Sequence, residues 1–318
     1  MSLFNYFVSK TIMHVPGALV GYFARNYIAG ETLQEAVGVA KDLNSRGVMA
    51  TIDILGEFIQ SMDDARFFTD QCLEILEAID RRKLEANLSL KPTQLGLLLD
   101  PQAAFENIRR IVARAADLNN FVRLDMEDRH CTDATLDLFR RLRVPYKGSL
   151  GTVLQAYLRR TMRDIDGLSD GYLNIRICKG IYNEPWQAAY KDPELINRNY
   201  VLCLQKLLEQ GAYVGIATHD EKLIFEALHL IRALGLKRGQ YEFQMLLGVR
   251  EGLRDMLVAE GHRVRVYVPY GKSWLPYARR RLRENPVIAR HALRQLLGIG
   301  PDRAGRRSSG PALHRPAA

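Results

Sequence analysis

Charged side chains recur at the carboxyl ends of short apolar segments, where they could bind a small anion. Lys91 ends the segment NLSLK, Asp125 lies within VRLDMED, and Arg176 and Lys179 lie within IRICKG. A charge at the end of a buried strand is costly unless it is paired or binds a ligand. Arg176 and Lys179 therefore need either an anionic ligand or an internal acid, and Asp125 is an available partner.

A second cationic group follows the last apolar segment of the chain. Residues 279–283 read RRRLR and are followed by Glu284, in a stretch with helical character. The planar guanidinium group binds carboxylates and phosphates through paired hydrogen bonds. Arg280 and Arg281 could therefore converge on an anion beside this helix. The alternative is a solvated basic face.

Several common catalytic motifs are absent from the sequence. There is no G-x-S-x-G motif, and no G-x-G-x-x-G follows an apolar segment. The segment YGKSW at 270–274 is no phosphate-binding loop, because Val266 stands where the first glycine would have to be. His130 and His219 lack the H-x-H and H-E-x-x-H spacings of metal sites. We therefore expect no metal and no hydrolytic nucleophile, while a nucleotide cofactor held by loops and helix N-termini remains open.

The elements that must position these residues alternate along the chain. Eight short segments are continuously apolar, which is typical of parallel strands buried on both faces. Longer amphipathic segments between them are predicted as helices, for example 63–82, 103–118, 193–210 and 221–234. The predicted strands are residues 48–55, 87–91, 121–126, 148–155, 173–179, 213–218, 241–246 and 264–270.

Three glycines support this alternation. Gly47, Gly211 and Gly261 each lie between a predicted helix and the next strand, where glycine commonly closes a helix in the left-handed conformation. Alternating strands and helices form parallel βαβ units. Eight units favour a closed α/β barrel, a fold of about 250 residues whose active site lies at the carboxyl ends of the strands. Two open doubly wound sheets are the alternative.

The positive charge of the chain is concentrated at one end. The net charge is +9, and residues 276–318 hold ten arginines and two acidic residues. A nucleic-acid-binding domain needs a basic face with stacking aromatics, so we expect no nucleic-acid partner. We divide the chain into N-terminal helices (1–45), a barrel (46–298) and a disordered tail rich in arginine and proline (299–318). The acid-poor first thirty residues leave a transit peptide or a membrane-surface helix as alternatives.

Cysteine usage and hydropathy bear on the compartment. The four cysteines form no C-x-x-C pair, which favours a reducing environment. No run of 18 apolar residues exists that could span a membrane. We therefore expect a cytoplasmic protein.

Seven sequence blocks, in order, resemble the bacterial single-domain proline dehydrogenases, whose catalytic domain also occurs in bifunctional proline-utilisation enzymes. The resemblance covers roughly residues 28–297. The most specific block is YVPYGKSWLPYARRRLRENP at 267–286. The other blocks are SLKPTQLGL, VRLDMED, QAYLRRT, IRICKGIYNEP, ATHD and YEFQMLLGVRE.

The resemblance implies a fold and a reaction. The fold would be a distorted (βα)8 TIM barrel that binds FAD, with extra N-terminal helices and a final helix over the barrel mouth. The reaction would be oxidation of L-proline to Δ1-pyrroline-5-carboxylate by hydride transfer to flavin N5. Electrons would pass to a membrane quinone, which implies a peripheral position on the inner face of the cytoplasmic membrane.

The resemblance also implies roles for individual residues. Lys91, Asp125, Arg176 and Tyr267 match the catalytic positions of the family. The expected substrate-binding residues are Lys91, Tyr267, Arg280, Arg281 and Glu284, with Asp125 paired to Lys91. The expected cofactor-binding residues are Gln155, Arg176, Cys178, Lys179, Gly180, Tyr182, Thr218, His219 and Gln244.

Two features depart from the family, and two alternative functions stay open. Cys178 stands where many relatives have valine, and Leu247 where they often have an aromatic residue or histidine. A dehydrogenase of hydroxyproline or another cyclic amino acid is one alternative, which the bulk of Tyr267 disfavours. An inactive barrel that serves as a binding module is the other, and the intact set of charged residues argues against it.

Overall fold

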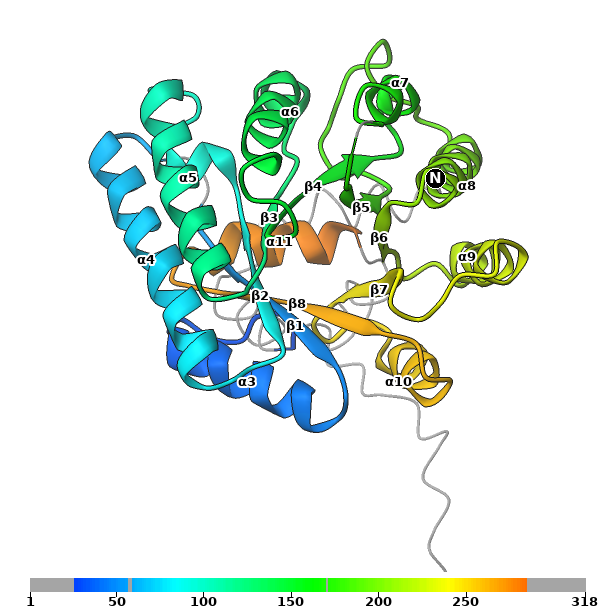
Figure 1. Cartoon of the computed structure of the whole chain (residues 1–318), viewed down its shortest axis with the longest axis horizontal. Coiled ribbons are helices and arrows are strands. Elements are labelled where there is room, and N and C mark those ends of the chain that lie inside the picture. Colours follow the sequence, from blue (N-terminus) through cyan, green and yellow to red (C-terminus); the bar gives the residue numbers. More distant parts are fainter. Residues whose placement is uncertain (1–25, 57–58, 170, 285–318) are drawn as a thin grey trace, which may run out of the picture. The chain divides into compact units, whose positions relative to one another are not determined.

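Eight parallel strands form a closed barrel in which each strand pairs with the next and β8 pairs with β1 (Figure 1). The computed structural model describes residues 26–56, 59–169 and 171–284, the last five of these without side chains. This confirms the predicted α/β barrel, and the alternative of two open sheets is wrong. The strands are β1 (Met49–Ile54), β2 (Ala86–Leu90), β3 (Val122–Leu124), β4 (Leu150–Gln155), β5 (Asn174–Cys178), β6 (Tyr213–Ala217), β7 (Tyr241–Leu246) and β8 (Val264–Tyr270).

Helices connect the strands and surround the barrel (Figure 1). The four helices predicted by residue range are all present, with ends within two residues of the prediction. The helices of the barrel are α3 (Leu33–Ser45), α4 (Met62–Arg81), the 3-10 helix η2 (Pro92–Leu95), α5 (Pro101–Asp117), α6 (Arg129–Arg143), α7 (Thr161–Asp166), α8 (Pro193–Glu209), α9 (Glu221–Ala233) and α10 (Glu251–Ala259). A last helix, α11, spans Trp274–Glu284.

The barrel lies within one compact unit, Ala24–Tyr277, and the second unit comprises Met1–Phe23 and Ala278–Ala318. Of the predicted N-terminal helices, α3 belongs to the barrel unit and buries Leu33, Ala36 and Leu43 in the core. Residues before 26 and the predicted tail at 299–318 lie outside the described residues. The predicted domain boundaries, and a final helix over the barrel mouth, therefore stay predictions.

Helix ends follow the expected local chemistry. Gly47, Gly211 and Gly261 have φ angles of 73°, 74° and 76°, which confirms that they close helices in the left-handed conformation. At the start of α9, Asp220 is the N-cap residue and its side chain accepts a hydrogen bond from the Lys222 backbone N–H. The helix thus begins directly after a strand end that carries polar residues.

The strands are buried on both faces, as predicted, but their inner face is polar. Residues such as Ile52 and Leu88 pack in the hydrophobic core, while the alternating positions Thr51 and Asn87 hydrogen-bond to each other, with 2.6 Å between Oγ1 and Oδ1. Arg123 on β3 reaches across to β5, where it donates to the Asn174 carbonyl oxygen. Alternating side chains point to opposite faces of a strand. The helices cover the apolar face, and hydrogen bonding makes a polar interior tolerable.

Gly151 provides the space for the Arg123 side chain. A Cβ atom at this position would overlap the Arg123 guanidinium group and the Asn174 carbonyl oxygen. We predict that Gly151→Ala destabilises the protein by about 1–3 kcal/mol, because overpacking forces such groups apart. The free energy of unfolding in urea measures this.

The matched control is Gly38→Ala, at an exposed position inside α3 where an added Cβ would meet nothing within 4 Å. It should be neutral or stabilise the protein by up to about 1 kcal/mol, because alanine is the better helix former. Equal stability of the Gly151→Ala variant and the parent would contradict the overpacking argument.

Candidate active site

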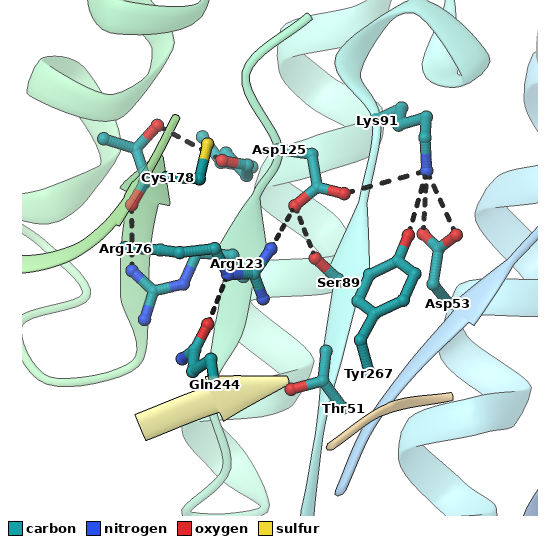
Figure 2. A network of polar contacts seen from close by, with 12 residues as sticks. Thr51, Asp53, Ser89, Lys91, Arg123, Asp125, Arg176, Cys178, Gln244 and Tyr267 are labelled. Atoms are coloured by element: carbon teal, nitrogen blue, oxygen red, sulfur yellow. Dashed lines mark hydrogen bonds and ion pairs between the residues drawn. The ribbon is translucent and has the colours of Figure 1, made fainter. Parts of the chain in front are cut away.

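Lys91 lies at the centre of a buried polar cluster where β2 ends (Figure 2). Its Nζ lies 3.0 and 3.2 Å from the two carboxylate oxygens of Asp53, 3.3 Å from the Tyr267 hydroxyl and 3.7 Å from Asp125 Oδ2. The expected ion pair of Lys91 with Asp125 is therefore present. A shorter one, with Asp53, accompanies it.

Asp53 is completely buried, and this burial determines its pKa more than any other factor. Burial, together with the negative charge of Asp125, raises the pKa of Asp53 to about 6 against the opposing attraction of Lys91. Burial and the charge of Asp53 also raise the pKa of Tyr267 well above its ordinary value. Tyr267 is therefore a neutral hydroxyl at physiological pH.

A second ion pair joins Asp125 on the loop after β3 to Arg176 on β5. The Arg176 Nη1 donates to Asp125 Oδ1 over 2.8 Å, and the Ser89 hydroxyl donates to the same oxygen over 2.7 Å. The other side of the guanidinium is held by Gln244, whose Oε1 lies 2.5 Å from Arg176 Nε. Of the two alternatives that the sequence left open for Arg176, an internal acid is present, and it is Asp125. Figure 2 shows this pair and the Lys91 cluster sharing Asp125.

Lys179 follows the end of β5, whereas Arg176 lies in the middle of this strand and not at its end as predicted. Lys179 has a different acid partner. Its Nζ lies 2.7 Å from Asp220 Oδ2, in the loop that begins α9. The adjacent Cys178 has its pKa raised to about 11, chiefly by burial, so the thiol is protonated at physiological pH. Gly180 packs against the Tyr157 ring, which a Cβ atom would overlap. Tyr182, in the same loop, is partly buried.

Gln155, at the end of β4, is almost fully buried. Its Nε2 donates to the Glu127 carbonyl oxygen over 2.8 Å. Its Oε1 is buried and has no hydrogen-bond partner among the described residues. A buried acceptor without a partner is costly and points to a missing donor.

Thr218 and His219 follow β6, and His219 connects this loop to the end of β7. The Thr218 hydroxyl accepts from the Asp220 backbone N–H over 3.1 Å. His219 Nε2 accepts from the Leu246 backbone N–H over 2.8 Å, which places the proton of a neutral ring on Nδ1. Their predicted role toward a cofactor stays a prediction.

The structure thus brings Lys91, Asp125, Arg176 and Tyr267 into one contact network, and Gln244 with them. The side chains of the remaining predicted substrate-binding residues lie outside the described part of the chain, although their backbones belong to α11. These residues are Arg280, Arg281 and Glu284.

Three further buried charges belong to the same interior: Asp53, Arg123 and Glu242, with exposed fractions of 0, 2 and 2 %. Asp53 is one of the polar residues expected at the strand ends, whereas Arg123 and Glu242 were missed. Each is the only charged residue of its strand, Met49–Ile54, Val122–Leu124 or Tyr241–Leu246. A lone charge in a buried strand requires a partner from another strand. The sequence does not say which strand supplies it.

Comparisons with known proteins agree with this geometry. The family model described as proline dehydrogenase matches residues 36–292. A proline dehydrogenase of Deinococcus radiodurans is 37 % identical over 278 residues, which cover 86 % of this chain and 90 % of that protein. Proline dehydrogenase 2 of Bacillus subtilis is 38 % identical over 263 residues, which cover 83 % of this chain and 86 % of that protein.

Solved structures show the same fold. The crystal structure of proline utilization A from Bdellovibrio bacteriovorus, inactivated by N-propargylglycine, has a TM-score of 0.78 and is 25 % identical. The match covers 86 % of this chain and 34 % of that protein, so this chain spans about a third of the larger one.

The raised pKa of Asp53 gives a prediction about stability. A carboxyl group whose pKa is higher in the folded than in the unfolded protein binds an extra proton on folding. Its contribution to the stability of the folded protein therefore decreases as the pH rises through the folded-state pKa. Between pH 4 and 6 the stability of the parent, relative to the Asp53→Asn variant, should therefore decrease by up to about 1.4 kcal/mol per pH unit.

Urea unfolding of both proteins at a series of pH values measures this difference. Subtracting the variant removes the contribution of carboxyl groups remote from Asp53, which titrate equally in the two proteins. A difference that does not change with pH would show that the pKa of Asp53 is not raised.

Proposed function

Because this chain belongs to the proline dehydrogenase family and is therefore an oxidoreductase, we propose that it oxidises L-proline to Δ1-pyrroline-5-carboxylate with FAD. The observation that carries this proposal is the convergence of Lys91, Asp125, Arg176 and Tyr267 in one buried network inside the barrel, where β2 and β3 end. Sites at this end of a barrel, built from several different strands, are the usual location of its chemistry.

The residues present fit a flavin. The Gln155 Oε1 atom is a buried acceptor without a partner among the described residues, and the ring edge of a flavin offers an N–H donor. Arg176 donates through Nε and Nη1 to protein groups. Its third nitrogen, Nη2, can then face the flavin ring, which becomes electron-rich when it is reduced. We assign the ring to Gln155 and Arg176, and the remainder of the cofactor to Cys178, Lys179, Gly180, Tyr182, Thr218, His219 and Gln244.

When bound, FAD supplies a hydride acceptor for C5 of the substrate. The side chains of this chain supply orientation and electrostatics. Lys91 offers its ammonium group to the substrate carboxylate, and the neutral hydroxyl of Tyr267 lies 3.3 Å from the same nitrogen. No side chain has to act as a nucleophile, which agrees with the absence of a catalytic triad motif.

The two cations of the network are already paired with carboxylates, so the substrate carboxylate needs a further cation. Lys91 and Arg176 already face two carboxylates, Asp53 and Asp125. The substrate carboxylate therefore adds an uncompensated negative charge, which is costly in a buried site. We assign the compensating charge to Arg280 and Arg281, paired with Glu284, as the family resemblance implies.

We further propose a membrane quinone as electron acceptor, reached from a peripheral position on the inner face of the cytoplasmic membrane. Support for this comes from the family resemblance. Among the described helices, none combines the length and the apolar character that crossing a membrane requires.

The visible spectrum of the purified protein tests the proposal. We expect a flavin spectrum that bleaches on anaerobic addition of L-proline and recovers when a short-chain quinone is added. A spectrum that responds to 4-hydroxyproline in preference to proline would indicate another cyclic amino acid as substrate. No flavin after reconstitution with FAD would favour a barrel without enzymatic activity.

Replacing Lys91 tests its role in substrate binding. Hydrogen bonds to charged groups contribute about 1.5–3 kcal/mol, so Lys91→Met should raise the KM for proline by roughly 10- to 150-fold. The matched control is Lys83→Met, which removes an exposed lysine that pairs with Asp80. Steady-state kinetics that show an unchanged KM for Lys91→Met would exclude Lys91 from the carboxylate site.

A further inference from the structure

A buried carboxylate on β7, Glu242, is connected to Arg176 through one intermediate side chain, that of Gln244. Arg265 on β8 donates to Glu242 through Nε over 2.7 Å and through Nη2 over 3.1 Å. The Tyr213 hydroxyl donates to Oε2 over 2.8 Å. Burial opposes the charge of Glu242, but Arg265 and these hydrogen bonds together lower its pKa to about 2. Glu242 is therefore a carboxylate, which can only accept hydrogen bonds.

Gln244 lies between Glu242 and Arg176, and its amide has one permitted orientation. The Nε2 group donates to Glu242 Oε1 over 2.6 Å, and Oε1 accepts from Arg176 Nε over 2.5 Å. An arginine only donates and a carboxylate only accepts. Rotating the amide by half a turn would place a donor against Arg176 and an acceptor against Glu242. The charges on either side thus determine which way the amide points.

Gly215 on β6 provides the space for this contact. In the barrel register Gly215 pairs with Arg176 on one side and with Glu242 on the other. A Cβ atom at Gly215 would lie 2.5 Å from the Gln244 Nε2 atom. The missing side chain of β6 thus leaves a gap on the inner face of the sheet, and the Gln244 amide fills it.

We propose that Glu242 is a positioning residue for Arg176: it holds the Gln244 amide in the orientation that presents Oε1 to the Arg176 guanidinium, in the space left by Gly215. This proposal rests on the proposed function, in which Arg176 faces the flavin. Arg176 is then held from two sides, by Gln244 and by Asp125, and its position depends on a carboxylate that touches neither substrate nor cofactor.

The midpoint potential of the bound flavin tests this proposal, measured by equilibration with a redox dye. The reference is Arg176→Gln, which removes the positive charge and should lower the potential, because a cation stabilises the electron-rich reduced form. Glu242→Gln and Gly215→Ala should lower it in the same direction, by about 30 mV or more. A shift of about 30 mV corresponds to a tenfold change in the equilibrium constant of a two-electron reduction.

The sign of the Glu242→Gln effect separates positioning from plain electrostatics. Removing a negative charge from the interior would by itself raise the potential, whereas a misplaced Arg176 lowers it. Gly215→Ala changes no charge and displaces the amide alone. It also keeps the proposal testable if Glu242→Gln fails to fold because Arg265 loses its partner.

Tyr213→Phe is the matched control. It removes a hydrogen bond to Glu242 Oε2 and leaves Oε1, the atom that receives the Gln244 amide, unaltered. Its potential should equal that of the parent. If Arg176→Gln lowers the potential while Gly215→Ala leaves it unchanged and Glu242→Gln raises it, the positioning proposal is wrong. If Arg176→Gln itself has no effect, the proposed place of Arg176 at the flavin is wrong instead.

Discussion

A charge enclosed in a barrel has lost most of its hydration, and the interior of this protein is arranged around that cost. An ionised side chain without a partner is expensive in such a place, so charges must be paired or hydrogen-bonded. Here one connected series of contacts runs from Arg265 through Glu242 and Gln244 to Arg176, and on through Asp125 to Lys91 and Asp53. Each member restrains the next. The position of each side chain therefore depends on partners from several strands.

One buried cation has no carboxylate partner in this series. Arg123 donates to the carbonyl oxygens of Thr152 and Asn174, and its guanidinium carbon lies 4.7 Å from the Phe121 ring centroid. Burial, with repulsion from other arginines, lowers its pKa to about 9. At neutral pH it still carries its charge. Its two terminal nitrogens donate to neutral acceptors, and its Nε has no hydrogen-bond partner among the described residues. This arrangement leaves the interior with a positive bias, which would suit the substrate carboxylate and the added electrons of the proposed reaction.

The barrel makes this interior possible because each strand has an apolar face toward the helices and a polar face toward the interior. On β7, Phe243 packs in the hydrophobic core while the neighbouring Glu242 and Gln244 form polar contacts on the opposite face. The apolar face beneath the helices supplies most of the favourable burial. The inner face is then available for groups chosen for chemistry. A (βα)8 barrel can carry a charged interior because its core lies mainly between the sheet and the helices.

Much of this protein is determined locally in the sequence. Apolar runs, amphipathic stretches and closing glycines such as Gly47 predict the eight strands and their helices, because these features act over a few residues. Strand ends also identified Lys91, Asp125 and Arg176 as candidates, since a charge there stands out against an apolar background. The pairing of Lys91 with Asp53, and of Arg265 with Glu242, was decided only by the tertiary structure. Both pairs join strands that lie side by side, β1 with β2 and β7 with β8. The free energy of a buried ion pair depends on distances of a few ångströms that no local pattern records.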